Sequence, residues 1–263
     1  MFEPDFEAYR DKYPHVKMER KDGILLLQLH SDGRPLQWGV VKTEIAYMLS
    51  DVGQDSGNRV IILTGTGESF IDSVEMDSGG PKMSHGEWAR FWSGSGLQEG
   101  KRLIMNHLDV KAPMIAAVNG PATVHADMAL LCDIVLAVPE ATFQDSPHLP
   151  IGVFPGDGVH VIWPFLLGMN RARYFLLTGQ KLSAEQALQL GLVNEIVPRD
   201  DLLARAQELA GQIAAMPRAA VNLFREAVLK SLRRAVFEDQ GYGVLMQGLT
   251  SFDYWPFGQI ASD

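Results

Sequence analysis

The chain has 263 residues, of which 46% are hydrophobic and 21% charged. These proportions are typical of a globular protein and exclude disordered and collagen-like chains. Because 23 basic against 32 acidic residues give a formal charge of -9, the chain repels polyphosphate backbones, so we expect no nucleic-acid partner. At about 150 residues per domain, the length predicts one large domain or two small ones. Chemistry on a small molecule is the better expectation.

The sequence carries no signal for membranes or export. No apolar run approaches the ~18 uninterrupted residues of a membrane span, so we expect no membrane partner. The N-terminal segment MFEPDFEAYRDKYPHVK is polar and acidic, where a secretory signal needs a cationic start and an apolar run. The single cysteine, Cys132, cannot form an internal disulfide, which agrees with a reducing compartment. We therefore predict a cytoplasmic protein.

Short apolar runs alternate with helical segments in the first half of the chain. The runs at 23–29 and 59–63 have the length of buried strands, and 40–52 between them has a helical pattern. The pattern returns at 113–118 and 133–137, after a long amphipathic stretch from Gly86 to Leu108. This alternation predicts an α/β layer structure with buried, largely parallel strands.

The last third of the chain is predicted to be helical. A capping box at Ser183–Gln186 begins this region, and helical periodicity continues to about residue 250. Pro217 opens a long amphipathic segment, as proline does at a first helical turn. We expect a core domain over 1–200 and a C-terminal helical region over 201–263 that mediates assembly.

Three loops are rich in Gly, Pro and polar residues directly after predicted strands, at 64–81, 119–127 and 142–160. Binding and catalytic sites of α/β folds lie in such loops. The glycines of the first loop, Gly65 and Gly67, lack the third glycine or the GK[ST] sequence of a nucleotide site. A nucleotide cofactor is therefore not expected.

The chemistry of these loops points to histidine and carboxylate. Their histidines and aspartates, among them Asp145 and His160, have spacings that permit metal ligation, yet no HExxH-like signature appears and we expect no metal. No GxSxG elbow is present, and Cys132 lies in an apolar segment where a thiol is usually inert. What remains is acid–base chemistry, with N–H groups stabilising an oxyanion.

Four blocks carry a resemblance to a known superfamily: RVIILTGTGESF, APMIAAVNGPATVHADMALLCDIVLA, ATFQDSPHLPIGVFPGDG and LTGQKLSAEQALQLGLVNEIV. In this order, over roughly residues 20–200, they resemble the crotonase (enoyl-CoA hydratase/isomerase) superfamily. The resemblance implies a spiral of ββα units, a C-terminal helical region, and trimers or dimers of trimers. It also implies two backbone N–H groups, at Asp72 and His125, that stabilise an enolate.

The chain departs from ordinary hydratases of this superfamily at the catalytic positions. Asp127 and His148 stand where they carry their two catalytic glutamates. His125 lies in a turn that is glycine-rich in those enzymes, and Asp157 replaces a small residue. A thioester hydratase that works through two glutamates is therefore not the expected enzyme.

The same departures resemble a narrower branch, 6-oxocamphor hydrolase and related β-diketone hydrolases. That branch cleaves a cyclic 1,3-diketone by a retro-Claisen reaction with water and without a cofactor. The resemblance implies that Trp38 and His125 donate hydrogen bonds to a carbonyl, and that His148 with Asp157 forms the general-base dyad.

Two further residues are assigned to the neighbourhood of the site by the same resemblance. Asp127 is expected as a neighbour of the site, and the alternative to a catalytic role is a favourable charge at a helix N-terminus. Gln247 stands where the branch contributes a glutamate, so the protonation step is expected to differ. The substrate-binding set is thus Asp72, Asp127 and Gln247.

Three hypotheses follow from different classes. The preferred one is a cofactor-free hydrolase that cleaves a cyclic or bulky β-diketone to a keto acid and assembles as a homotrimer or a dimer of trimers. The second is an enoyl-CoA hydratase or isomerase with a modified active site. The third is a scaffold without activity, serving RNA binding or assembly, against which the acidic charge counts.

Overall fold

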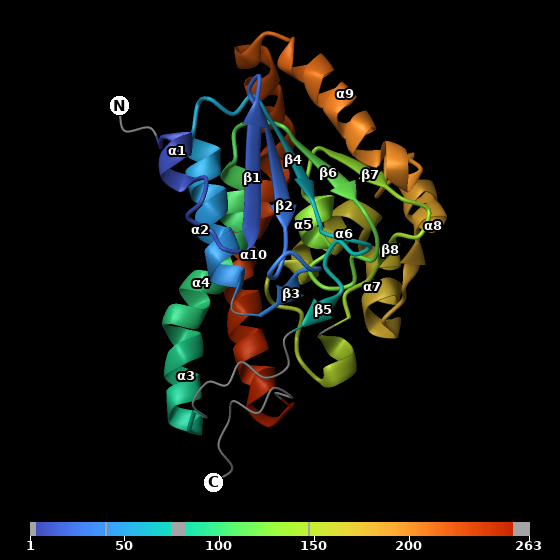
Figure 1. The fold of residues 1–263 in the computed structure, drawn as a ribbon. Helices are drawn as coiled ribbons and strands as arrows, with labels where there is room; N and C mark the ends of the chain where they lie inside the picture. Colours follow the sequence, from blue (N-terminus) through green and yellow to red (C-terminus); the bar gives the residue numbers. More distant parts are fainter. Residues whose placement is uncertain (1–3, 40, 75–82, 147, 255–263) are drawn as a thin grey trace.

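The computed structural model describes residues 4–39, 41–74, 83–146 and 148–254, so that part of the predicted loop 64–81 and the end of the region 201–263 lie outside the described residues. Within the described part, six strands form the main sheet in the order β1-β2-β4-β6-β7-β10 (Figure 1). Strand β1 is antiparallel to β2, and every other neighbouring pair is parallel. The strands are β1 (Val16–Lys21), β2 (Ile24–Leu29), β4 (Val60–Thr64), β6 (Met114–Val118), β7 (Ile134–Ala137) and β10 (Glu195–Ile196).

The centre of this sheet is built from continuous apolar runs. Every residue of β4 and of β6 is buried, as expected for parallel strands covered on both faces. Burial alternates along β2, from Ile24 to Leu29, nearer the sheet edge. The predicted α/β class with a largely parallel sheet is confirmed.

A tight hairpin adds the edge strand β1, which the sequence prediction omitted. Asp22 and Gly23 connect β1 to β2, and both have positive φ, 51° and 78°. An Asp-Gly pair suits the type I′ turn, which requires positive φ at both central residues. Along β1 burial alternates at its first four residues, since only one side chain in two reaches the core.

Short strands form a second row beside the main sheet. Strand β3 (Gln37–Trp38) pairs in parallel with β5 (Ser73–Val74), and β8 (Thr142–Phe143) pairs with β9 (Leu182–Ser183) in antiparallel. Single bridges join Ile71 to Ala122 and Ala122 to Phe143. Successive turns of the chain thus add a long strand to the sheet and a short strand or bridge to this row.

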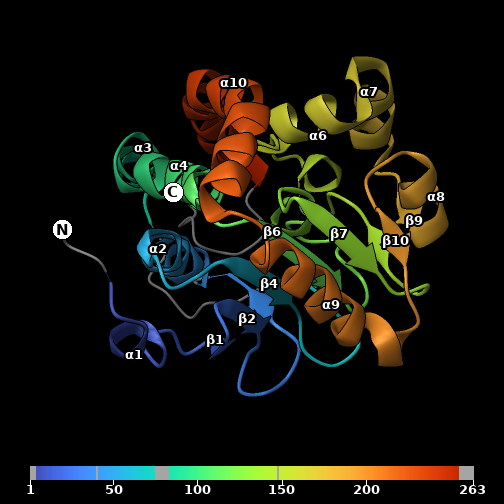
Figure 2. The same cartoon turned by 90° about the horizontal axis from the view of Figure 1, so that it is seen from above.

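Helices enclose both rows, and Figure 2 shows α9 lying across the sheet and α10 beside α4 and α6. Helix α9 contacts β2, β4, β6 and β7, whereas α10 packs against α3, α4 and α6. The helices are α1 (Phe6–Tyr9), α2 (Val41–Gln54), α3 (His85–Ser93), α4 (Ser95–Asp109), α5 (Asp127–Leu130), α6 (Val159–Leu167), α7 (Met169–Thr178), α8 (Ala184–Gln189), α9 (Leu202–Ala214) and α10 (Arg218–Tyr254), with 3-10 turns η1 (Leu149–Ile151) and η2 (Arg199–Asp201).

Two helical predictions can be compared with this arrangement. The capping box at Ser183 is present, with Gln186 as its partner, and begins α8. The single amphipathic stretch predicted from Gly86 to Leu108 is instead two helices, α3 and α4. They are separated at Gly94, whose φ of -119° and ψ of -104° lie outside the helical region.

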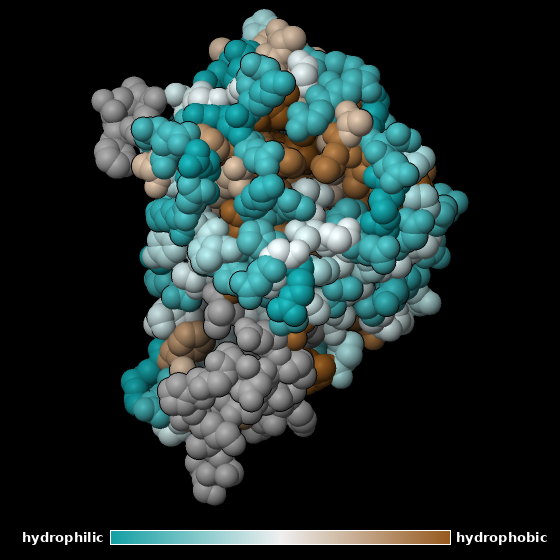
Figure 3. All heavy atoms as spheres, in the orientation of Figure 1, coloured by the Kyte–Doolittle hydropathy of each residue, from teal (hydrophilic) through white to brown (hydrophobic). Residues whose placement is uncertain are grey.

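The outer surface is mixed. The face in Figure 3 is mostly hydrophilic, with apolar side chains gathered in its upper half between the strands and α9. Among the described helices, none combines the length and the apolar character that crossing a bilayer requires.

A close backbone contact joins the loop before α6 to the long helix α10. A Cβ added at Gly156 would lie 1.9 Å from the carbonyl oxygen of Gly243, and one added at Gly243 would lie 2.0 Å from Cε1 of His160. Neither position has room for a side chain. The loop therefore contacts α10 at one defined position, Gly243.

We expect Gly243→Ala to lower the free energy of unfolding by about 2 kcal/mol or more, because the added methyl group forces the loop away from the helix. The matched control is Gly211→Ala in α9, where nothing lies within 4 Å of the added atom. That change should be neutral or stabilise by about 0.5–1 kcal/mol, since alanine is the better helix former. Urea unfolding of both variants measures the difference, and equal midpoints would contradict the close contact.

Candidate active site

The loops that follow β4 and β6 are held together by one side chain. Asn119 donates from Nδ2 to the carbonyl oxygens of Gly67 and Ser69 and accepts from the N–H of Gly65. A Cβ at Gly120 would lie 1.7 Å from the carbonyl oxygen of Glu68, so the two loops touch through their backbones. Two of the three predicted polar loops are therefore adjacent at the carboxyl end of the sheet.

His125 ends the loop after β6 in an unusual backbone conformation. Its φ is 47°, in the left-handed region that glycine adopts freely and that costs other residues roughly 1–2 kcal/mol. Its side chain is 4% exposed, so an imidazole is buried at a position suited to glycine.

Asp157 lies between two positions that favour glycine, in the loop that leads to α6. Gly158 has a φ of 110° and begins the helix, while Gly156 makes the close contact with α10. The Asp157 side chain is buried. It is thereby held near the N-terminus of α6, where a negative charge is favourable.

Three basic nitrogens surround the carboxylate of Asp157. Nε2 of His125 lies 3.1 Å and Nζ of Lys42 3.4 Å from Oδ2, and Nε2 of His148 lies 3.5 Å from Oδ1. Both histidines are buried, whereas the lysine side chain is 23% exposed. The structure thus brings the predicted dyad, His148 and Asp157, within ion-pair distance.

His148 has a closer partner on its other ring nitrogen. Nδ1 lies 2.7 Å from Oδ1 of Asp145, which is also buried. Nε2 faces Asp157 and the side-chain nitrogen of Gln247, the latter at 3.4 Å. Sequence reasoning named Asp145 only as a conceivable metal ligand, and it did not foresee Lys42.

Trp38 packs against His125. The two ring centroids are 4.2 Å apart, with the rings inclined by 35°. Strand β3 delivers the indole, because its pairing with β5 fixes the backbone at Gln37 and Trp38. Among the described residues no hydrogen-bond acceptor is found for the indole N–H, so the group remains available to a ligand.

The three predicted substrate-binding residues differ in their surroundings. Gln247 lies in α10, buried beside His148, and its Oε1 has no hydrogen-bond partner among the described residues. Asp127 begins α5 and is 1% exposed; its Oδ1 lies 3.4 Å from Nδ1 of His125 without hydrogen-bond alignment. Asp72 is exposed. The backbone beside it, at Ile71, accepts from the N–H groups of residues 123 and 124, which places Asp72 near the His125 turn.

His125, His148 and Asp157, with Asp145 beside them, form one buried cluster. Its electrostatics favour the protonated histidines and the ionised Asp157. Burial lowers the pKa of His148, but the carboxylates of Asp157 and Asp145 outweigh burial and raise that pKa to about 10. Burial likewise lowers the pKa of His125, which Asp157 and Asp127 raise to about 9. Burial raises the pKa of Asp157, but the opposing charges of His148, Lys42 and His125 hold it well below its usual range.

Chemically, the buried side chains combine a proton acceptor with hydrogen-bond donors. An imidazole that accepts a proton at Nε2 can activate water, and the indole and backbone N–H groups can stabilise an oxyanion. In the part of the chain that the structure describes, no group of three or more His, Cys, Asp or Glu side chains is arranged to hold a metal ion.

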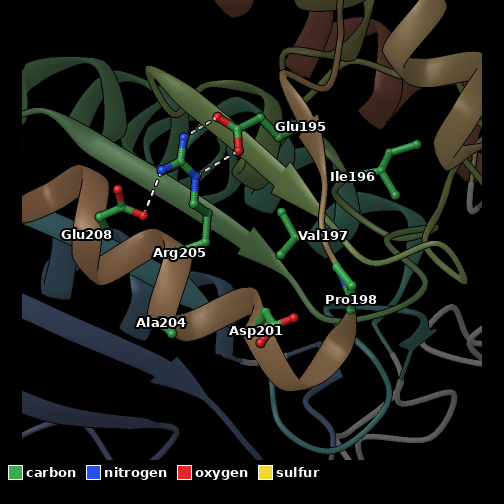
Figure 4. Close-up of a pocket in the computed structure, with 8 residues that line it drawn as sticks. All are labelled: Glu195, Ile196, Val197, Pro198, Asp201, Ala204, Arg205 and Glu208. Carbon is green, nitrogen blue, oxygen red and sulfur yellow. Dashed lines mark hydrogen bonds and ion pairs between the residues drawn. The ribbon is translucent and has the colours of Figure 1, made fainter.

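A separate cleft of about 380 Å³ lies between β10 and α9 (Figure 4). Its cation, Arg205, donates to both carboxylate oxygens of Glu195 and to Glu208. None of the residues of the cluster lines this cleft. Because Arg205 is paired with Glu195 and Glu208 and no histidine lines the cleft, it offers no reactive group comparable with the buried histidines.

Comparison with known proteins places the chain in a family. The enoyl-CoA hydratase/isomerase family model matches residues 34–246. A short-chain-enoyl-CoA hydratase from Clostridium acetobutylicum is 31% identical over 208 residues, which are 76% of this chain and 77% of that protein. The chain is also 28% identical to the α subunit of a fatty acid oxidation complex from Shewanella sp. (strain ANA-3), of which it spans 30%.

Solved structures give a further likeness. A β-diketone hydrolase from the cyanobacterium Anabaena sp. PCC 7120, bound to (S)-3-oxocyclohexyl acetic acid, is 38% identical with a TM-score of 0.88, covering 96% of this chain and 99% of that one. An enoyl-CoA hydratase subunit from Geobacillus kaustophilus is 29% identical with a TM-score of 0.68, covering 89% and 88%. The predicted ββα spiral is therefore confirmed, and the chain belongs to the crotonase, or enoyl-CoA hydratase/isomerase, superfamily.

Proposed function

We propose that the chain hydrolyses a carbon–carbon bond of a cyclic or bulky β-diketone and releases a keto acid, without a cofactor. The observation that carries the proposal is the buried meeting of His148 with Asp157 beside His125 and Trp38. The likeness to a β-diketone hydrolase supports it, since that protein was solved with a molecule that is both a ketone and a carboxylic acid.

The first step needs a base, because water is a weak nucleophile at neutral pH. Nε2 of His148 removes a proton from water, and the resulting hydroxide adds to one carbonyl carbon of the diketone. Asp157 stabilises the imidazolium formed in this step, as a carboxylate does beside a catalytic histidine. Nε2 faces Oδ1 of Asp157, which has no hydrogen-bond partner among the described residues and so can hold the water.

Donors are needed when the carbonyl oxygen becomes an alkoxide. The indole N–H of Trp38 and the backbone N–H groups of His125 and Asp72 suit this role, and each donor contributes about 3 kcal/mol in a dry site. The ring of His125 is less free, since its nitrogens lie 3.1 Å and 3.4 Å from the carboxylates of Asp157 and Asp127. We therefore assign His125 to the carbonyl chiefly through its backbone.

The alkoxide then collapses and breaks the bond to the carbon that lies between the two carbonyls. The electron pair moves into an enolate of the second carbonyl, which is why a 1,3-diketone is a suitable substrate. The proton held by His148 returns to the enolate carbon, so that water is consumed and a keto acid is formed. Gln247, beside Nε2 of His148, has no acidic proton and orients rather than protonates.

The second candidate is hydration or isomerisation of a CoA thioester. The similarity to the short-chain-enoyl-CoA hydratase from Clostridium acetobutylicum supports this candidate. Against it stands the resemblance, which implies that Asp127 and His148 occupy the positions of the two catalytic glutamates of ordinary hydratases. An aspartate is one methylene shorter, and here it is enclosed and turned toward His125. The two candidates therefore predict different substrates for one cluster.

A panel of cyclic 1,3-diketones and one enoyl-CoA separates the candidates. We expect turnover of a diketone, and at least a hundredfold lower turnover for His148→Gln, which removes the base, and for Asp157→Asn, which removes the carboxylate that stabilises its imidazolium. Asp200→Asn, an exposed aspartate in η2, is the matched control and should retain activity. Turnover of the enoyl-CoA alone, or full activity of both site variants, would contradict the proposal.

The pH dependence provides a second test. His148 acts in its neutral form, and its pKa is raised to about 10, so kcat/KM should rise with pH through the neutral range with a slope near 1 on a logarithmic scale. Asp157→Asn removes a charge that raises this pKa. Its rising limb should therefore move to lower pH, with a lower plateau. A flat profile between pH 6 and 9 in the unsubstituted protein would be incompatible with His148 as the base.

We also propose that the chain forms a homotrimer or a dimer of trimers through α10. Large apolar side chains of this helix are exposed in the single chain, including Phe224 (71%), Leu223 (69%) and Phe237 (65%). Such groups are usually covered in an assembly. Sedimentation velocity should show a species of at least three chains, and Phe224→Glu should weaken it. A monomer at all concentrations would refute the assembly.

A further inference from the structure

The imidazole of His148 lies between two carboxylates that occupy different nitrogens. Asp145 lies 2.7 Å from Nδ1, a short hydrogen bond, whereas Asp157 lies 3.5 Å from Nε2. All three side chains are buried. The shorter and better-directed contact is therefore made by the aspartate to which the catalytic dyad assigns no role.

The backbone on both sides of Asp145 is tied to the segment that precedes His125. The N–H of Gln144 donates to the carbonyl oxygen of Ala122, and the N–H of Ser146 donates to that of Thr123. Asp145 is thus fixed relative to the turn that carries the proposed oxyanion donor. Through the hydrogen bond at Nδ1, the ring of His148 is fixed relative to the same turn.

We propose that Asp145 is the positioning residue of His148: by accepting the hydrogen bond from Nδ1–H, it selects the tautomer whose Nε2 accepts the proton of the nucleophilic water. This inference deepens the proposed function and rests on it for the role of His148. A carboxylate on Nδ1 is the arrangement by which histidine bases are oriented in hydrolases generally. Asp157 then acts at Nε2, on the opposite side of the ring, where it faces the nucleophilic water. It also contacts His125 and Lys42.

The assignment can be tested without any substrate. A buried, short Nδ1–H···O contact should give a downfield proton resonance in the protein labelled with 15N, and His148→Gln identifies it by its loss. We expect Asp145→Asn to abolish the resonance or move it upfield, and Asp157→Asn to leave it in place. Loss in Asp157→Asn together with retention in Asp145→Asn would overturn the proposal.

Kinetics on a diketone substrate provide a second readout. The titratable groups nearest His148 are Asp145 and Asp157, with His125 and Lys42 beyond the latter. Asp145→Asn should lower kcat by about 10²–10⁴-fold, since the wrong tautomer is then favoured, with KM changed less than threefold and the rising pH limb displaced to lower pH. Asp145→Glu should recover part of the loss. Unchanged kcat in Asp145→Asn would reject the role.

The two proposals fail in different ways. If no diketone is hydrolysed but the resonance depends on Asp145, the proposed function is rejected and the positioning contact stands. If diketones are hydrolysed but Asp145→Asn behaves like the control Asp200→Asn in both measurements, only the positioning role is rejected. Circular dichroism and sedimentation of Asp145→Asn, which is nearly isosteric with the original residue, show whether the variant is folded.

Discussion

The carboxylate of Asp157 is the group on which the arrangement of the site depends. It is buried, and a buried charge is costly unless opposite charges and hydrogen bonds surround it. Lys42, His125 and His148 supply that surrounding from three different segments of the chain. Removal of the carboxylate would leave His125, His148 and Lys42 without the buried negative charge that they share. The same ion therefore organises the site and raises the pKa of both histidines, together with Asp145 and Asp127.

The placement of these side chains depends on backbone positions that have little room or an unusual conformation. Asp157 is placed between Gly156, which has no room for a side chain, and Gly158, which has a φ of 110°. His125 is the reverse case, because a bulky residue occupies a left-handed conformation that glycine would adopt without cost. The strained backbone of His125 and the absence of side chains at Gly156 and Gly158 thus both help to bring the polar groups together.

The extent to which the fold was predictable differs between elements for physical reasons. The runs that became β4 and β6 are apolar at every position, so their burial on both faces is visible in the sequence. The strand β1 was missed because it alternates at an edge, although Asp22-Gly23 is a recognisable hairpin turn. The division of one helix into two at Gly94 depends on a local conformation that periodicity does not report.

The candidate site was predictable as far as its residues resemble those of a family. His148, Asp157, His125 and Trp38 were named from such a likeness, and the structure gathers them in one place. Lys42 had no signal, because a lysine at the start of a helix is usually a solvated surface group. Asp145 precedes His148 by three residues, but which nitrogen it meets depends on the ring orientation, which spacing does not determine.

The contact between Gly156 and Gly243 has a mechanical consequence. The two backbones touch without an intervening side chain that could yield by changing rotamer. Displacement of α10 along its axis would therefore press on the loop that carries the neighbouring Asp157, while Gln247 moves with the helix itself. The position of α10 and the alignment of the site are therefore coupled. Heat or denaturant that loosens this helix would lower the activity before the sheet unfolds.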